Sequence, residues 1–166
     1  MKIKDKEIVS KVVIKHRGFY DHEKVIKAIF DWFKHNDFFF DVTKYKLTGI
    51  TLKYTYYGDK KVTEYLKWWM KCFLIIYQLE EVEIIKEGKK IKTYHGKFHA
   101  EITGELEIDW QKRYQEKGKF LTLIGDFLRE YILRYKIKDM WEDELCLKVE
   151  ELADVIKDAL GHEVIK

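Results

Sequence analysis

The residues that could carry metal chemistry lie on one short stretch and are His95, His99 and Glu101. Their even spacing would place them on one face of a β-strand, since strand side chains alternate between two faces. Imidazole and carboxylate groups are ligands for zinc or iron. Metal sites, however, draw ligands from several elements, and the opposite face of this stretch carries Phe98 and Ile102. The pattern therefore predicts a solvated strand face and no metal site.

Two carboxylates, Asp41 and Glu64, have apolar neighbours in the sequence and are the candidates for acid–base catalysis. Such catalysis needs a carboxylate or a histidine in a desolvated pocket beside a partner group. The sequence places no partner beside either residue, which favours surface positions for both. The motifs of serine hydrolases, P-loop proteins, dinucleotide-binding proteins and zinc proteases are also missing. We therefore expect no catalytic residues, no cofactor and no autonomous enzymatic activity.

A nucleic-acid surface could be built from lysines and aromatic rings that interleave in one region. Base stacking combined with phosphate contacts is the mechanism that such a surface uses. The net charge is only +3, and four of the 32 basic residues are Arg, the residue that base readout favours. Association with RNA or the ribosome is therefore the second alternative function, and its residues would be Lys53, Tyr54, Tyr56, Tyr57, Lys60 and Lys61.

A protein-interaction surface is suggested by the adjacent residues Trp68 and Trp69. On a strand, neighbouring side chains point to opposite faces. One indole is expected to enter the core. The other requires a cover from a helix, a ligand or another chain, because large exposed aromatic patches mark interaction sites.

The composition favours a single soluble domain that spans residues 1–166. Hydrophobic residues make up 46% of the chain and aromatic residues 16%, which is enough for a bulky core. Cys72 and Cys146 are interpreted as reduced core thiols. The longest apolar run, 72–77, is too short to span a membrane, and no signal peptide is recognised at the start. We expect a cytoplasmic protein. The Lys/Glu/Ile bias with one Asn is typical of a thermophilic archaeon or bacterium, or of one of its viruses.

The elements that would position these residues begin with a strand at 7–20 and a helix at about 22–35. Asp21 suits the helix N-cap, and apolar residues follow at helical spacing. Strands are predicted at 38–48 and 50–57, with Gly58-Asp59-Lys60-Lys61 as a hairpin turn. A long antiparallel hairpin within 60–110 turns at Glu87-Gly88-Lys89-Lys90, and its second strand alternates apolar and polar residues.

The C-terminal segment 119–160 carries two apolar stripes at helical spacing. The first covers 119–135 and the second 141–160, with Gly161 as the C-cap residue. The stripes are out of register near Lys138-Asp139, which indicates either a bent helix or two helices. The first stripe is expected to face the sheet, so that Phe127, Leu128 and Tyr131 are buried.

This order of elements predicts an α+β fold, in which a curved antiparallel sheet packs on a long C-terminal helix. By element order it resembles the helix-grip superfamily, which includes the START, Bet v 1 and polyketide-cyclase-like (SRPBCC) proteins. The resemblance covers nearly the whole chain and implies an apolar cavity between the sheet and the helix. One helix follows the first strand here, where the superfamily usually has two, and no site residue is carried over.

The function expected from this fold is that of a non-catalytic domain that binds an apolar small molecule or lipid. The alternatives are a structural or protein-interaction module, including a homo-oligomer, and the RNA-associated factor. A core that is filled by interdigitating rings would leave no cavity. The side chains expected to line the cavity are apolar rings and branched residues of the strands and of the 119–135 helix: Tyr54, Tyr56, Phe98, Ile102, Phe120, Phe127 and Tyr131.

Overall fold

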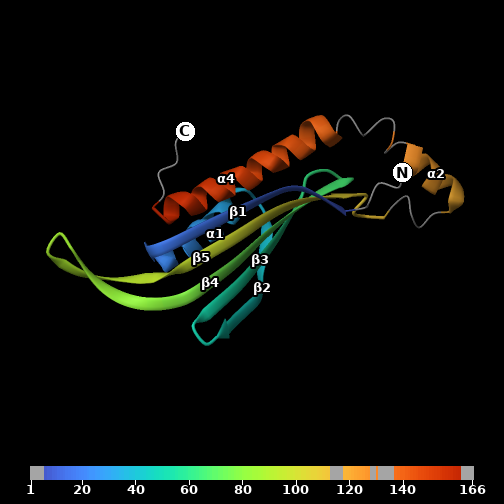
Figure 1. Ribbon diagram of the computed structural model, residues 1–166. Helices are drawn as coiled ribbons and strands as arrows, with labels where there is room; N and C mark the ends of the chain where they lie inside the picture. Colours follow the sequence, from blue (N-terminus) through green and yellow to red (C-terminus); the bar gives the residue numbers. More distant parts are fainter. Residues whose placement is uncertain (1–5, 113–117, 128–129, 131–136, 162–166) are drawn as a thin grey trace.

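The computed structural model describes residues 6–112, 118–127, 130 and 137–161, and within them the fold is α+β (Figure 1). The elements follow the order strand, helix, four strands, then helices. Their bounds are β1 (Lys6–Tyr20), α1 (His22–His35), β2 (Phe39–Thr48), β3 (Thr51–Lys61), β4 (Leu66–Lys86), β5 (Lys89–Ile108), α2 (Lys119–Phe127), a π-helical turn η2 (Ile137–Glu142) and α4 (Asp143–Ala159).

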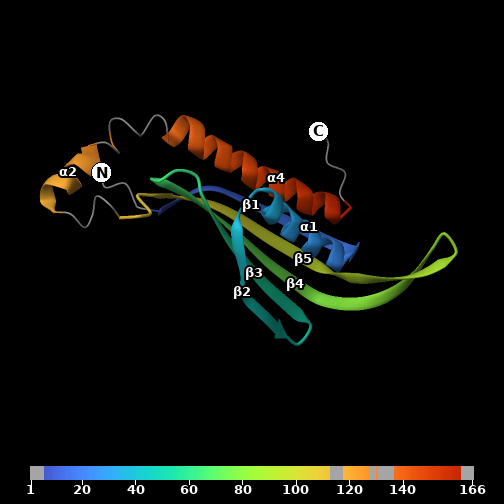
Figure 2. The same ribbon diagram turned by 180° about the vertical axis from the view of Figure 1, so that it is seen from behind.

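The five strands form one antiparallel sheet in the order β1-β5-β4-β3-β2. The sheet is curved, and α1 and α4 lie on its inner face in both views (Figures 1 and 2). The alternation predicted for β5 is confirmed, because Phe98, Ala100 and Ile102 are buried, whereas Lys97 is exposed and His99 and Glu101 are only partly buried. An antiparallel sheet with one covered and one solvated face needs this pattern.

β4 and β5 continue beyond the other strands as a two-stranded arm (Figure 1). The arm begins at a bulge where the register shifts between Tyr77 and Glu80, and Gln78 adopts a φ of 53°. Gly96 lies opposite this bulge, where an added Cβ would come within 3.1 Å of the Tyr77 carbonyl oxygen. The turn at the tip is Glu87-Gly88, and both residues have positive φ, as a two-residue hairpin turn requires.

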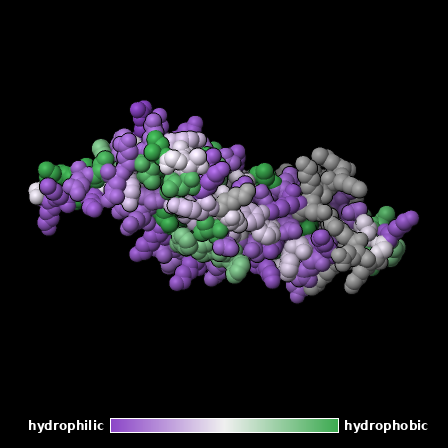
Figure 3. Space-filling view, turned by 90° about the horizontal axis from the view of Figure 1, so that it is seen from below, coloured by the Kyte–Doolittle hydropathy of each residue, from purple (hydrophilic) through white to green (hydrophobic). Residues whose placement is uncertain are grey.

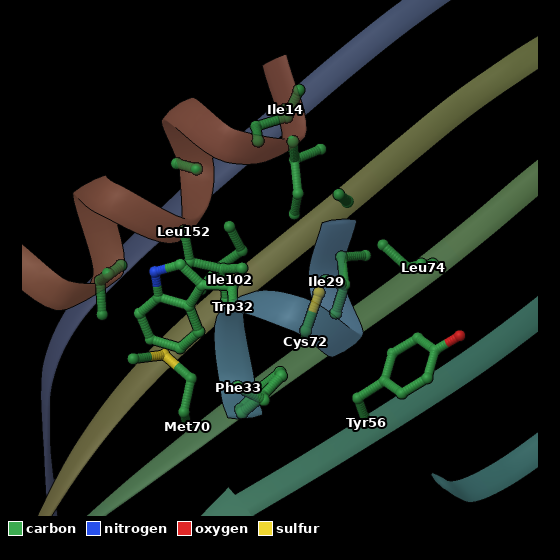
Figure 4. Close-up of a cluster of buried hydrophobic side chains, with 14 of the residues drawn as sticks. Ile14, Ile29, Trp32, Phe33, Tyr56, Met70, Cys72, Leu74, Ile102 and Leu152 are labelled. Atoms are coloured by element: carbon green, nitrogen blue, oxygen red, sulfur yellow. The ribbon is translucent and has the colours of Figure 1, made fainter. Parts of the chain in front are cut away.

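Helix α1 has the predicted bounds, His22–His35, and Asp21 is its N-cap. The Asp21 carboxylate accepts a hydrogen bond from the Lys24 backbone N–H at 3.1 Å. Val25, Ile29 and Phe33 are completely buried against the sheet. Figure 4 shows Ile29, Trp32 and Phe33 of α1 beside side chains of the central strands.

Among the described helices of the C-terminal part, the one that packs on the sheet is α4 and not α2. Leu145, Val149, Leu152 and Ile156 have no exposed surface, and Gly161 ends the helix with a φ of 84°. The prediction that Phe127 is buried is wrong, because 54% of this residue is exposed. Leu128 and Tyr131 lie outside the described residues.

The predicted turn at Gly58-Asp59-Lys60-Lys61 is also wrong, because these residues belong to β3 and pair with β4. Gly58 is buried, and a Cβ placed on it would come within 2.8 Å of the Phe33 ring. This glycine therefore allows the close approach of α1 to β3. The chain reverses after Lys61, where Thr63 Oγ1 accepts hydrogen bonds from the Tyr65 and Leu66 N–H groups.

Candidate functional site

A cluster of hydrogen-bonding aromatic side chains lies where α1 begins. It consists of Tyr20 at the end of β1, His22 at the start of α1, Tyr54 on β3 and Tyr94 on β5, and we call it the His22 cluster. Tyr20 and Tyr94 are directly paired across β1 and β5. The strand-to-helix junction at Asp21 then places the imidazole of His22 beside the rings of the inner sheet face.

The His22 ring contacts each of the three tyrosine rings of the His22 cluster. The centroid of the His22 ring lies 6.0 Å from that of Tyr20, 5.8 Å from that of Tyr54 and 5.7 Å from that of Tyr94. The His22 Nε2 atom lies 3.4 Å from the Tyr54 hydroxyl oxygen. Thr93 supports the junction, because its hydroxyl donates to the Tyr20 carbonyl oxygen at 3.2 Å.

Two polar atoms of this cluster are buried without a hydrogen-bond partner among the described residues. They are the Tyr20 hydroxyl and His22 Nδ1; only 4% of Tyr20 and 9% of His22 is exposed. The other two such atoms are the indole nitrogens of Trp32 and Trp68. Burying a polar group without a partner costs about 1–3 kcal/mol. Each such group in a native fold calls for an explanation, and a binding site is one.

The His22 cluster is electrically neutral at physiological pH. Burial lowers the pKa of His22 below its usual 6.5, although the nearby Glu23 and Asp21 oppose this effect. Burial also raises the pKa of Tyr20 and of Tyr54; the other phenols, including Tyr94, add to both shifts. The site therefore offers an uncharged imidazole and uncharged hydroxyl groups, which donate and accept hydrogen bonds.

An exposed apolar strip adjoins the cluster on the inner face of the sheet. Val42, Tyr45 and Leu47 of β2 pair with Tyr56, Tyr54 and Leu52 of β3, so they face inward. Yet 61% of Tyr45 and 61% of Leu47 is exposed. We call Val42, Tyr45 and Leu47 the open strip. The Tyr45 and Tyr54 rings lie 5.1 Å apart, which connects the open strip to the His22 cluster.

Further apolar residues lie around the open strip. Phe30 of α1 is 37% exposed and its ring lies 5.6 Å from that of Tyr56, while Ile50 in the β2–β3 turn is 57% exposed. Figure 3 views the molecule from the side on which the β2–β3 hairpin projects, and apolar residues gather near the middle of this face. The polar cluster thus lies next to an apolar surface.

The described residues among those predicted to line a cavity divide between the core and α2. Tyr56, Phe98 and Ile102 are buried in the core between the sheet and the helices, and Tyr54 contributes to the His22 cluster. Phe120 and Phe127 are on α2, which lies at one end of the molecule (Figure 1). Tyr131 lies outside the described residues.

The two adjacent tryptophans point to opposite faces, as predicted. Trp68 is buried, and its ring lies 6.3 Å from that of Trp141. Trp69 is on the outer face, where the Lys6 and Lys67 ammonium groups each lie 4.2 Å from its ring and Tyr57 stacks on it at 4.9 Å. Its indole N–H donates to Glu107. Trp69 is therefore covered by side chains of its own sheet.

The other candidates from the sequence are dispersed. Asp41 and Glu64 are exposed. His95 contacts Phe19 on the outer face, and Glu101 pairs with Lys11 at 3.0 Å. In the described part of the chain, no group of three His, Cys, Asp or Glu side chains is arranged to hold a metal ion. The lysines and tyrosines considered for RNA binding divide between both faces: Tyr56 is buried inside, while Tyr57 stacks on Trp69 outside.

Comparisons of the chain with protein-family models, with curated proteins and with solved structures return no match. Within the described ranges, the helices are all too short or too polar to cross a membrane.

His22 should make stability depend on pH. The pKa of His22 is lower in the folded protein than in the unfolded chain. Its contribution to the free energy of unfolding is therefore fully present above pH ~6.5, and it is lost as the pH falls below that value toward the folded pKa. Urea unfolding between neutral and mildly acidic pH should show a steeper loss of stability for the parent than for His22→Phe. Equal slopes for the parent and His22→Phe would contradict the burial argument.

Proposed function

We propose that this protein is a non-catalytic binding domain for an apolar small molecule with one uncharged polar end. The apolar body would lie on the open strip, and the polar end would reach the His22 cluster. The observation that carries this proposal is that two buried polar atoms, the Tyr20 hydroxyl and His22 Nδ1, have no hydrogen-bond partner within the described part of the chain and lie beside exposed apolar residues. Ligand sites commonly combine an apolar lining with a few polar groups that orient the ligand.

The polar end of the ligand should be uncharged. The imidazole is neutral because burial lowers the pKa of His22, and the phenols are neutral because burial raises the pKa of Tyr20 and Tyr54. A carboxylate or ammonium group would lose its hydration here without gaining an opposite charge, which is costly. A hydroxyl or carbonyl group would lose less hydration free energy on burial, and it could form a hydrogen bond with the Tyr20 hydroxyl.

The body of the ligand should be apolar, and a flat ring system suits the rings around it. Tyr45 and Tyr54 lie 5.1 Å apart, and Tyr54 stacks on Tyr56 at 6.0 Å with an interplanar angle of 11°. Phe30 closes the same region from α1. Aromatic pairs gain about 0.5–1.5 kcal/mol beyond the area that they bury, so aromatic ligands are the first to test.

The test compares 1-naphthol with 1-methylnaphthalene, which replaces the hydroxyl group by a methyl group of similar size. Calorimetry should show that the parent protein binds 1-naphthol about tenfold more tightly, the value of one net hydrogen bond. In Tyr20→Phe this preference should disappear. The same substitution should raise the free energy of unfolding of the ligand-free protein by about 1 kcal/mol, since it removes a buried hydroxyl group without a partner.

Tyr77→Phe is the matched control, because Tyr77 is 43% exposed and lies on the outer face. It should leave both affinities and the stability unchanged. The proposal would be wrong if neither naphthalene raised the melting temperature of the parent, or if Tyr20→Phe destabilised the protein and kept the preference for 1-naphthol.

A further inference from the structure

The outer face of the sheet carries basic side chains that extend across it from β1 to β2. α1 and α4 pack on the inner face (Figures 1 and 2), so they leave the outer face open. The strand pairings define two neighbouring rows of residues there. One row contains Lys15, His99, Ile75, Lys53 and Lys46, and the next contains Arg17, Lys97 and Tyr77. We call the five exposed cations of these rows the basic band: Lys15, Arg17, Lys46, Lys53 and Lys97.

The positive charge of the basic band is not neutralised by its described neighbours. Neither row holds a carboxylate. The row on one side holds Glu101, which pairs with Lys11 at 3.0 Å, and the row on the other side holds Glu80. Within the described ranges, the side chains of the basic band form no ion pair. The band therefore concentrates positive charge, although the net charge of the whole chain is only +3.

Two exposed aromatic rings lie among these cations. Tyr77 is directly opposite Lys97 and is 43% exposed, while Phe19 lies one row further along β1 and is 56% exposed. β5 separates β1 from β4. Because neighbouring strands are about 4.8 Å apart, the two rings are roughly 10 Å apart across the sheet. The outer face thus combines cations with flat apolar rings.

We propose that the outer face binds a single-stranded nucleic acid, with the phosphates on the basic band and the bases against Tyr77 and Phe19. Proteins that bind single strands combine a positively charged track for the backbone with aromatic side chains on which bases stack. Of the residues that the sequence suggests for RNA association, only Lys53 belongs to the basic band. The proposal does not depend on the His22 cluster or on the open strip, which lie on the inner face.

Other occupants match the outer face less well. A second copy of the chain would bring the same cations against one another. Duplex nucleic acid keeps its bases inside and would offer nothing to the exposed rings. An anionic bilayer would attract the cations, but it has no flat rings to stack on Tyr77 and Phe19. A single strand supplies both phosphates and unstacked bases.

Fluorescence anisotropy of the full chain with a labelled oligouridylate of about ten nucleotides, a length that such surfaces cover, tests the proposal. We expect binding that weakens as the salt concentration rises. Lys53→Gln combined with Lys97→Gln should reduce the slope of log Kobs against log salt by about 1.4, which corresponds to two lost phosphate contacts. Tyr77→Ala should weaken binding about tenfold and keep the parent slope, because it removes stacking and no charge.

The chain offers matched controls for both effects. Lys24→Gln combined with Lys27→Gln removes the same charge from exposed positions of α1 and should keep the parent slope. Phe39→Ala removes a ring that is 80% exposed on β2, outside the two rows, and should keep the parent affinity. Tyr77→Phe should also keep it, because the stacking ring remains. The melting temperature of each variant should match that of the parent, which separates lost binding from lost folding.

Three results would overturn the proposal. The parent would fail to bind the oligouridylate at low salt, or the α1 variant would lower the slope as much as the variant of the basic band. The third result is that Tyr77→Ala keeps the parent affinity, which would indicate an anionic partner without bases, such as a bilayer.

Discussion

Phe33→Ala is expected to lower the free energy of unfolding by about 3–5 kcal/mol, the usual cost of truncating a buried Phe. Phe33 has no exposed surface, and its ring stacks on Phe40 at 5.0 Å and contacts Phe38 at 5.8 Å. Removing the ring would leave a cavity between α1 and β3, where Gly58 offers no side chain to fill it. The loss therefore includes both the transfer energy and the cavity.

Phe127→Ala is the matched comparison and should cost less than about 1 kcal/mol, because 54% of Phe127 is exposed on α2. Chemical denaturation of both variants, monitored by circular dichroism, gives the two values. If Phe127 instead contributed as much as Phe33, the expectation from the sequence that this residue packs in the core would be restored.

Local signals in the sequence correctly predict α1 and β5, because the ends and faces of these elements depend on residues within or next to them. Helix α1 begins at His22 because the Asp21 side chain satisfies a backbone N–H of the first turn. It buries the apolar stripe that the sequence shows at helical spacing. The strict alternation along β5 likewise predicted its inner and outer faces. In both cases the information lies within the element itself.

The error at Gly58 has a different origin. A glycine followed by Asp59 and two lysines has the composition of a turn, and no local signal distinguishes it from a strand residue. Gly58 is instead required by a residue 25 positions earlier, because the Phe33 ring occupies the space of its Cβ. Tertiary packing thus overrode a local preference that the sequence analysis had read correctly.

The assignment of the C-terminal helices shows a related limit. An apolar stripe predicts that one side of a helix is covered, but it does not identify the element that covers it. The sequence shows an apolar stripe in each of the two segments, 119–135 and 141–160, and predicts that the first one faces the sheet. Only the glycine at position 104, which sits under Leu145 and Val149, distinguishes α4 as the packed helix, and its role requires the strand register to be known.

The sequence does not indicate the His22 cluster, because Tyr54 on β3 and Tyr94 on β5 are far in sequence from the adjoining ends of β1 and α1. The sequence predicts that Tyr54 faces inward, whereas it indicates only a strand end for Tyr20 and a helix start for His22. The signal that could have indicated a site is the run Tyr20-Asp21-His22 at the junction of a strand and a helix. Ligand groups often lie at such ends, since loops and helix starts carry function.

Gly104→Val is expected to lower the free energy of unfolding by about 3 kcal/mol, at the upper end of the usual range for overpacking. Gly104 is buried on the inner face of β5, and a Cβ atom on it would come within 2.7 Å of Val149 Cγ2 and 3.2 Å of Leu145 Cγ. Two further methyl groups would have to displace α4 from the sheet, since both helix residues have no exposed surface.

A second substitution distinguishes this clash with α4 from a general destabilisation by any side chain at this position of β5. Val149→Ala alone should destabilise the protein, because it removes buried methyl groups. Combined with Gly104→Val it should restore part of the lost stability, so that the double variant is more stable than the sum of the single effects allows. Strictly additive losses in urea denaturation would show that Gly104 does not set the distance between β5 and α4. Partial recovery of the free energy of unfolding in the double variant would show that the contact at Gly104 sets the distance between α4 and β5.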